Sequence, residues 1–308
     1  TGSIFFVPRP DFPKTLPEFQ RRFSDESACR AYLAASRWPD GYRCPRCGHS
    51  EVFDLSRRHL MQCKECGLQT SVTAGTVLHR TRTPLTHWFW AAYLMATHTP
   101  GMSALQLQRQ LGLNRYETVW TMLHKLRRAM VAPHREPLRG IIEVDETYIG
   151  GPESGKRGRG AGGKSLVVGA VEDRDETAGR VRLQLIPNFK GNTLIAFVEA
   201  NVEHGATIKT DGLDGYEGLN KKHYCHKSRI QGSGERSTLW LPHIHRVFSN
   251  LKTWLRGTHH GVDRKHLQAY LGEFVFRYNR RSSPMAAFQT LLGIESHLGP
   301  TTYHQLCH

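Results

Sequence analysis

Two matched cysteine pairs constrain the fold of this chain more than any other feature of its sequence. They read Cys44-Pro-Arg-Cys47-Gly and Cys63-Lys-Glu-Cys66-Gly, with 15 residues between the pairs. A Cys-x-x-Cys turn places two thiolates side by side, and the glycine after it can adopt the positive φ that turns backbone amides toward them. Two such turns predict one structural Zn²⁺ held by all four thiolates. A redox pair would instead need one such motif at the start of a helix.

The charge balance predicts a polyanionic partner. The 308 residues carry 42 Lys and Arg against 27 Asp and Glu, a net charge of +15, and the isoelectric point is near 9.7. Such an excess is typical of proteins that bind nucleic acid in a salt-sensitive way. A membrane-surface protein is the alternative, but no basic amphipathic helix with a broad apolar face stands out. Without a long apolar run or a signal peptide, we expect a soluble intracellular protein with no membrane partner.

Changes in composition divide the chain into five expected segments. Pro133, Pro137 and Gly140 mark the main boundary, between a helical region and a strand-rich one. The segments are a lead-in over 1–40, a zinc ribbon over 41–75, a helical domain over 76–135, an α/β domain over 136–295 and a C-terminal tail over 296–308.

From residue 141 onward, strand-like and helical patterns are mixed. Strands are expected over 141–149, 165–172, 181–186 and 206–210, and helices over 193–202, 243–256 and 264–279. A chain with this mixture folds as an α/β domain, with helices packed on a sheet.

The helical region has the pattern of a helix-turn-helix. A short amphipathic helix over 103–111 is followed by Gly112 and by a second helix over 116–130. Such a pair can place its second helix in the major groove of DNA. Any two-helix hairpin looks similar, but the zinc ribbon and the net charge favour DNA binding. The candidate DNA contacts are Arg109, Arg115, Lys125, Arg127 and Arg128.

A glycine-rich basic segment spans residues 150–164. Lys156, Arg157 and Arg159 in this segment are candidate contacts to the DNA backbone, if the segment is an arm that orders on binding. A plain hairpin linker explains the same composition equally well.

Two aspartates follow strand-like runs and are candidate ligands for Mg²⁺. Asp145 ends the run Ile-Ile-Glu-Val-Asp, and alternation places it on the same strand face as Glu143. Asp211 ends a second run, immediately before Gly212. Two carboxylates that meet from separate strands can hold a divalent ion against a phosphodiester. Taken alone, Asp211 also fits an ordinary Asp-Gly turn.

The helix expected over 243–256 carries a polar stripe beside its apolar one. His245, Ser249, Lys252 and Arg256 recur at helical spacing, so His245 and Lys252 lie two turns apart on one side. The first is a candidate metal ligand and the second a candidate phosphate-binding cation. A solvated polar face is the plainer interpretation of such a stripe.

Several motifs together resemble a known family. The zinc ribbon and the helix-turn-helix precede the strings EVDETYIGG, TDG, HRVFSNLKTWLRGTHHGV and KHLQAYLGEFVFRYNRR. In this order they resemble bacterial insertion-sequence transposases of the DDE superfamily, in the group with an N-terminal zinc ribbon and an RNase H-like catalytic domain. The similarity runs from about residue 12 to 294.

This resemblance implies a mixed sheet flanked by helices, with Asp145 on the first strand and Asp211 after the fourth. The third metal ligand lies on a following helix, often as a glutamate seven residues before a lysine. Here that position, seven before Lys252, is His245, as in members with a DDH-type triad. Glu273 is the rival third ligand. Two Mg²⁺ or Mn²⁺ ions would be held by the triad, and because imidazole suits Mn²⁺ better than Mg²⁺, Mn²⁺ is expected to support more activity.

The resemblance implies a DNA transposase that binds terminal inverted repeats and catalyses strand cleavage and strand transfer. Lys252 would hold a DNA phosphate. Joining two DNA ends to one target requires at least a homodimer, acting at the bacterial nucleoid in the cytoplasm. A DNA-binding protein without catalysis, as a domesticated or inactive transposase, remains the alternative.

Overall fold

A computed structural model describes residues 12–131, 135–150, 164–229, 240–292 and 299–307. The chain forms two compact units. One comprises Thr1–Met130 with Ser282–His308, and the other comprises Val131–Arg281. The candidate DNA contacts Lys156, Arg157 and Arg159 lie outside the described residues.

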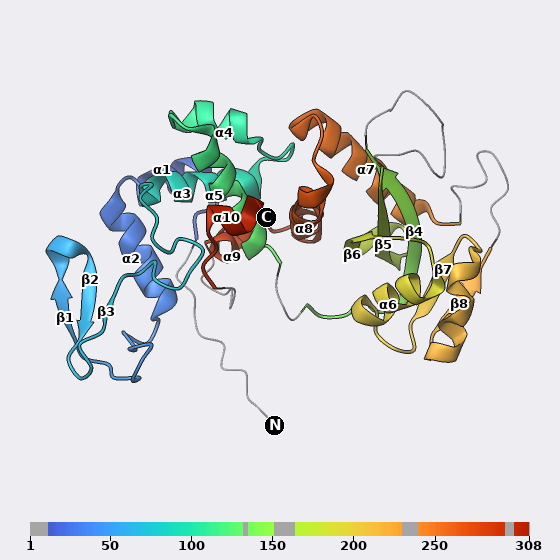
Figure 1. Cartoon of the computed structure of the whole chain (residues 1–308), viewed down its shortest axis with the longest axis horizontal. Coiled ribbons are helices and arrows are strands. Elements are labelled where there is room, and N and C mark those ends of the chain that lie inside the picture. The colour runs from blue at the N-terminus through green and yellow to red at the C-terminus, as the bar shows by residue number, and fades with distance from the viewer. Residues whose placement is uncertain (1–11, 132–134, 151–163, 230–239, 293–298, 308) are drawn as a thin grey trace. The chain divides into compact units, whose positions relative to one another are not determined.

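The region of the two cysteine pairs in the first unit holds a small antiparallel sheet, whose second strand ends at Cys63 (Figure 1). Its strands are β1 (Val52–Leu55), β2 (Leu60–Cys63) and β3 (Gln69–Thr70), in the order β1-β2-β3, with the 3-10 helix η1 (Ser56–Arg58) between the first two. Tyr42 packs with the buried Cys44 and Cys63 beneath this sheet. The core is too small to hold the sheet by itself, so the cysteine cluster must do so.

Helices surround an aromatic core in the rest of the first unit. They are α1 (Leu16–Arg22), α2 (Glu26–Arg37), α3 (Leu85–Thr97), α4 (Ala104–Leu111), α5 (Tyr116–Ala129), η4 (Pro284–Ala286), α9 (Ala287–Leu291) and α10 (Tyr303–Cys307). Helix α1 was not expected, since the lead-in reads as proline-rich.

Phe288 on α9 is almost fully buried in this aromatic core, with its ring centroid 5.5 Å from that of Phe89 on α3. The C-terminal residues from Ser282 therefore pack with the N-terminal ones. The compact α/β unit ends at Arg281, whereas the α/β segment expected from the sequence continues to residue 295.

The second unit is built on a mixed five-stranded sheet in the order β6-β5-β4-β7-β8 (Figure 1). Its strands are β4 (Ile141–Ile149), β5 (Ser165–Arg174), β6 (Thr177–Ile186), β7 (Thr207–Thr210) and β8 (Cys225–Ser228). The first three are antiparallel neighbours, while β7 runs parallel to β4 and β8 parallel to β7. The expected mixed sheet flanked by helices is confirmed, and β8 is a strand that the sequence did not indicate.

Two hydrophobic cores lie on opposite faces of this sheet. On one face, α6 (Gly191–Asn201) and the 3-10 helix η2 (Asp214–Lys222) cover Ile142 and Val144 of β4. On the other, α7 (Pro242–His259) and α8 (Arg264–Asn279) cover the alternate residues of β5 and β6. Because side chains alternate along a strand, Glu143 and Asp145 point toward the face that carries α7.

No helix among the described residues has both the length and the apolar character that a membrane crossing requires.

Candidate active site and metal centres

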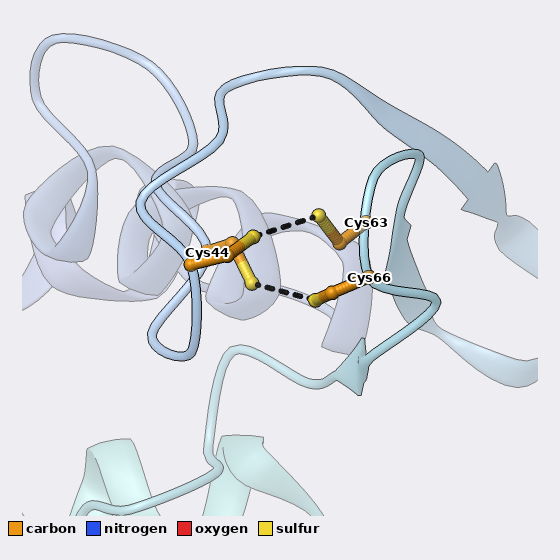
Figure 2. Close-up of side chains that lie close together, drawn as sticks. Cys44, Cys63 and Cys66 are labelled. Atoms are coloured by element: carbon orange, nitrogen blue, oxygen red, sulfur yellow. Dashed lines mark hydrogen bonds between the residues drawn. The ribbon is translucent and has the colours of Figure 1, made fainter.

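The four thiols of the two cysteine pairs gather at one point. Their sulfur atoms all lie within 4.8 Å of one another. Cys44 Sγ is 3.5 Å from Cys66 Sγ, and Cys47 Sγ is 3.6 Å from Cys63 Sγ. Figure 2 shows the labelled sulfurs of Cys44, Cys63 and Cys66 pointing into a common space. Four converging sulfurs fit the tetrahedral geometry of a closed, structural Zn²⁺ site.

Backbone geometry at the first turn favours a thiolate at Cys44. Gly48 and Gly67 adopt φ values of 73° and 68°, as the sequence predicted. Desolvation raises the pKa of Cys44, but the backbone N–H groups of Cys47 and Arg46 outweigh it and lower that pKa to about 6. Although the backbone N–H of His49 lowers the pKa of Cys47, desolvation and hydrogen bonds with the neighbouring thiols raise it to about 12. Binding of Zn²⁺, which needs deprotonated sulfur, would therefore release a proton from Cys47.

Asp145 and His245 meet although 100 residues separate them in the chain. His245 Nε2 lies 3.1 Å from Asp145 Oδ2, and the two side chains are 28% and 14% exposed. The hydrogen bond to Asp145 raises the pKa of His245 against the opposing effect of desolvation, and the charges of Glu143 and Asp211 add to it. A partly open carboxylate–imidazole pair can serve as metal ligands once the imidazole is neutral.

Asp211 follows β7 at the level of Asp145. Strand β7 pairs in parallel with β4, with Ile141 opposite Thr207 and Glu143 opposite Lys209. Continuing this register by two residues places Asp211, just after the end of β7, opposite Asp145, which lies in the middle of β4. Its Oδ1 accepts the backbone N–H of Leu213 at 3.1 Å, which shapes the following turn. Among the described residues, Asp145, Asp211 and His245 do not form a group whose ligand atoms all lie within 4.8 Å, as the cysteines do.

A glycine lets α7 approach the strand beside Asp145. Gly169 on β5 pairs directly with Asp145. A Cβ at Gly169 would lie 2.8 Å from Phe248 and 2.9 Å from Ile244, both on α7. Any larger residue would therefore force the ends of the Phe248 and Ile244 side chains to shift where α7 packs on β5.

Lys252 lines a basic pocket of about 650 Å³ next to β4. Lys164 and Arg256 contribute two more cations, and Tyr148 an aromatic ring. Desolvation and the neighbouring Arg256 lower the pKa of Lys252, while Asp145 partly restores it. A concave pocket lined by cations, close to the Asp145 carboxylate, is suited to bind an anionic DNA backbone.

Glu273, the rival third ligand, has a different environment. It is fully buried on α8, and its Oε1 lies 3.8 Å from the Arg277 guanidinium on the same helix. The carboxylate thus belongs to an intrahelical ion pair, whereas His245 faces Asp145.

Sequence reasoning missed two groups that support the site. Tyr216 is buried in η2, and its hydroxyl donates to Glu146, the neighbour of Asp145 on β4. Trp240 Nε1 donates to the carbonyl of Thr210, just before Asp211, at 2.8 Å. The two bonds tie residues next to Asp145 and Asp211 to later elements of the chain. Neither contact has a local sequence signal, because each depends on how distant elements pack.

The candidate DNA contacts on α4 and α5 differ in accessibility. Arg109, Arg115 and Arg128 are exposed, and Arg128 donates to Thr301. Lys125 is half-buried in a cleft of about 290 Å³. Arg127 is only 1% exposed, so it does not present its charge to DNA, which corrects the expectation for that residue. It shares a helix face with the buried Leu123, four residues before it.

Two family models match this chain. The transposase zinc-ribbon domain matches residues 24–69, and the ISXO2-like transposase domain matches residues 137–279. A protein described as an uncharacterized protein in transposable element ISH50, from Halobacterium salinarum, is 26% identical over 279 residues. That alignment covers 83% of this chain and 92% of the relative. The ribbon match begins within the segment expected to be a lead-in, before α2.

Proposed function

Because the chain belongs, by its zinc-ribbon and transposase domains, to the insertion-sequence transposases, we propose that it cleaves and transfers DNA strands at a site built on Asp145, Asp211 and His245. The observation that carries this proposal is the 3.1 Å contact between Asp145 and His245. It supports a DDH-type site, with α7 supplying the third ligand and Glu273 retained in its ion pair with Arg277.

The donor set of this site fits Mg²⁺ or Mn²⁺. Asp145, Asp211 and His245 would hold two such ions, which at sites of this class stabilise the charge on the attacking and leaving oxygens. Lys252, with Arg256 and Lys164 in the same pocket, binds and orients the DNA backbone. The cysteine cluster fits Zn²⁺, which there is structural.

The proposed reaction has two phosphoryl transfers. In the first, water attacks a phosphodiester at the end of the element, and the bond to the 3′ oxygen breaks to leave a 3′-hydroxyl and a 5′-phosphate. In the second, that 3′-hydroxyl attacks a phosphodiester of the target DNA, forming a new strand junction and releasing a target 3′-hydroxyl. Each step exchanges one P–O bond for another, so no oxidant or reductant is needed.

The first unit provides the proposed recognition of double-stranded DNA. Helices α4 and α5, joined by a four-residue turn from Gly112 to Arg115, would bind the terminal inverted repeats as a helix-turn-helix. Arg109, Arg115 and Arg128 are the exposed contacts of this surface. Because two ends must be joined to one target, we propose a homodimer or larger homo-oligomer that acts at the nucleoid.

The test is cleavage and strand transfer on labelled DNA that carries the ends of the encoding element, with Mg²⁺, Mn²⁺ or no divalent ion. Nicked and joined products that require metal and disappear in Asp145→Asn, while DNA affinity is retained, are the expected result. Tight binding without cleavage under every condition would instead identify a DNA-binding protein without catalysis.

A further inference from the structure

A fully buried carboxylate lies two residues before Asp145 on the same face of β4. Glu143 is 0% exposed, and its Oε2 accepts the backbone N–H groups of His243 at 2.9 Å and Ile244 at 2.8 Å. These amides belong to the first turn of α7, whose own N-cap residue, Leu241, makes no side-chain hydrogen bond. A strand residue therefore supplies the cap that the helix lacks.

This contact is favourable for two reasons. The first amides of a helix have no partner within the helix, and their partial positive charge attracts a carboxylate. A buried carboxylate in turn is costly unless hydrogen-bond donors surround it. Glu143 and the N-terminus of α7 satisfy each other, so the contact fixes this helix end against β4.

The Glu143 contact lies two residues before a candidate metal ligand on both β4 and α7. Two residues after Glu143 on the strand comes Asp145, and two residues after His243 on the helix comes His245. The Glu143 contact thus sets the position and rotation of the helix turn from which His245 reaches Asp145. Gly169 keeps this approach sterically open, and the Glu143 side chain bonds to the α7 backbone one and two residues before His245.

We infer that Glu143 is a positioning residue, which anchors the N-terminus of α7 to β4 and so holds His245 in reach of the metal site. The inference rests on the proposed function for its catalytic consequence, although the anchor itself does not. Residues that orient metal ligands typically change metal affinity or activity about 10–100-fold when they are removed.

A second ion site is the competing interpretation of these residues. Ligand atoms of Glu143, Asp173 and His243 lie within 4.8 Å of one another, and Glu143 Oε1 has no hydrogen-bond partner among the described residues. However, Lys209 Nζ already neutralises Asp173 at 2.7 Å, and His243 Nε2 is engaged by the carbonyl of Asp175 at 3.0 Å. The geometry favours the anchor, and a glutamine substitution separates the two interpretations.

Glutamine keeps the carbonyl oxygen that accepts both amides but cannot replace a carboxylate as a metal ligand. The experiment compares full-length, zinc-loaded wild type with Glu143→Gln and Glu143→Ala. Val198→Ala, which removes a fully buried side chain on α6, is the control for a general loss of stability.

Three quantities are measured: hydrogen exchange of the peptide over 241–247, Mn²⁺ binding by electron paramagnetic resonance without DNA, and single-turnover cleavage. Glu143→Ala should expose the amides of His243 and Ile244 and weaken Mn²⁺ binding and cleavage by about 10–100-fold. Glu143→Gln should stay within about threefold of wild type in all three, as a retained hydrogen-bond acceptor predicts. Val198→Ala should melt earlier and keep its Mn²⁺ affinity.

Loss of Mn²⁺ binding in Glu143→Gln as severe as in Glu143→Ala would overturn the anchor in favour of a charged metal ligand. Unchanged Mn²⁺ affinity in Glu143→Ala would overturn it as well. If Glu143→Ala does not fold, Glu143→Asp replaces it, because a shorter carboxylate keeps the charge but loses the reach. Wild type that binds Mn²⁺ but cleaves no DNA would refute the proposed function alone, since exchange and Mn²⁺ affinity still test the anchor.

Discussion

The zinc ribbon and the candidate active site bring their ligands together in opposite ways. The four ribbon cysteines come from two turns within 23 residues of chain, and their sulfurs converge within 4.8 Å. The active-site groups come from β4, the end of β7 and α7, and the contact between Asp145 and His245 spans 100 residues. A local site depends on its own loop geometry, whereas an assembled site depends on every contact that places its elements.

The two sites also differ in the chemistry of their ligands. Four thiolates close around one ion and leave no position for a substrate, which is what a structural site requires. The carboxylate–imidazole pair is partly exposed, next to a basic pocket, which is what a site acting on DNA requires. Each kind of site should therefore fail in its own way.

Removing zinc should produce the largest effect, and only in the ribbon. A structural zinc contributes on the order of 10 kcal/mol to the folding of a domain this small. Cys63→Ser, or chelation, should abolish hydrogen-exchange protection in the peptides over 44–70, while peptides of β4 and β5 stay protected. Cys225→Ser, which changes an exposed cysteine outside the ribbon, should alter neither region. Persistent protection of the ribbon without zinc would contradict a local, metal-dependent fold.

The stability of the five-stranded sheet should decrease in acid because Glu172 becomes protonated. Burial alone would raise the pKa of this residue, but hydrogen bonds from Arg180, Arg139 and Arg174 lower it from 4.5 to about 2. The lowered pKa contributes roughly 3 kcal/mol to the free energy of unfolding. This contribution is present above about pH 4.5 and is lost as the pH falls toward 2.

Urea titrations between pH 5 and 2.5, read by pulsed hydrogen exchange of the β5 and β6 peptides, measure this loss. Glu172→Gln should be less stable than wild type at pH 5 and show a flatter pH dependence over the same range. Identical slopes in the two proteins would show that another group controls the acid response.

Replacing Gly169 should disturb the assembled site without touching a ligand. The added methyl group in Gly169→Ala collides with Ile244 and Phe248, so we expect a loss of about 1–3 kcal/mol in the free energy of unfolding and a drop in cleavage. Gly257→Ala is the matched control, because a Cβ there meets no atom within 4 Å. Chemical denaturation and cleavage rates measure both effects. Equal stability and equal cleavage in the two variants would show that the close contact at Gly169 is not required.

The smallest expected effect concerns DNA recognition by the first unit. Arg115→Ala removes one exposed charge at the start of α5 and should weaken DNA binding by about 1 kcal/mol, with a salt slope smaller by about 1. Lys222→Ala removes the same charge from the second unit. Fluorescence anisotropy at several salt concentrations compares the two, and equal losses would argue against a specific DNA surface on α5.

The sequence predicts the local features well for a physical reason. Residues of β4 alternate and those of α7 and α8 repeat at helical spacing, so nearby patterns fix these elements. The positive φ of Gly48 follows from its place after a Cys-x-x-Cys turn in the same way. Information within about ten residues was sufficient for each of these predictions.

Features that depend on packing between distant segments were missed. The burial of Phe288 among N-terminal helices moved the limit of the α/β unit, although nothing near that residue indicates a partner. Strand alternation places Glu143 on the same face as Asp145, but its partners are backbone amides, which leave no trace in side-chain patterns. The charge of Arg127 suggested a DNA contact, but its spacing of four residues from the buried Leu123 places it on the buried face of α5.

We propose that α7 completes the metal site through His245. The most direct test of this proposal is Mn²⁺-dependent single-turnover cleavage of labelled element ends by His245→Ala and Glu273→Gln, compared with wild type. We expect a loss of at least about 100-fold in His245→Ala, with Glu273→Gln close to wild type once both are shown to be folded. Active His245→Ala together with inactive Glu273→Gln would contradict the proposal and assign the third ligand to α8.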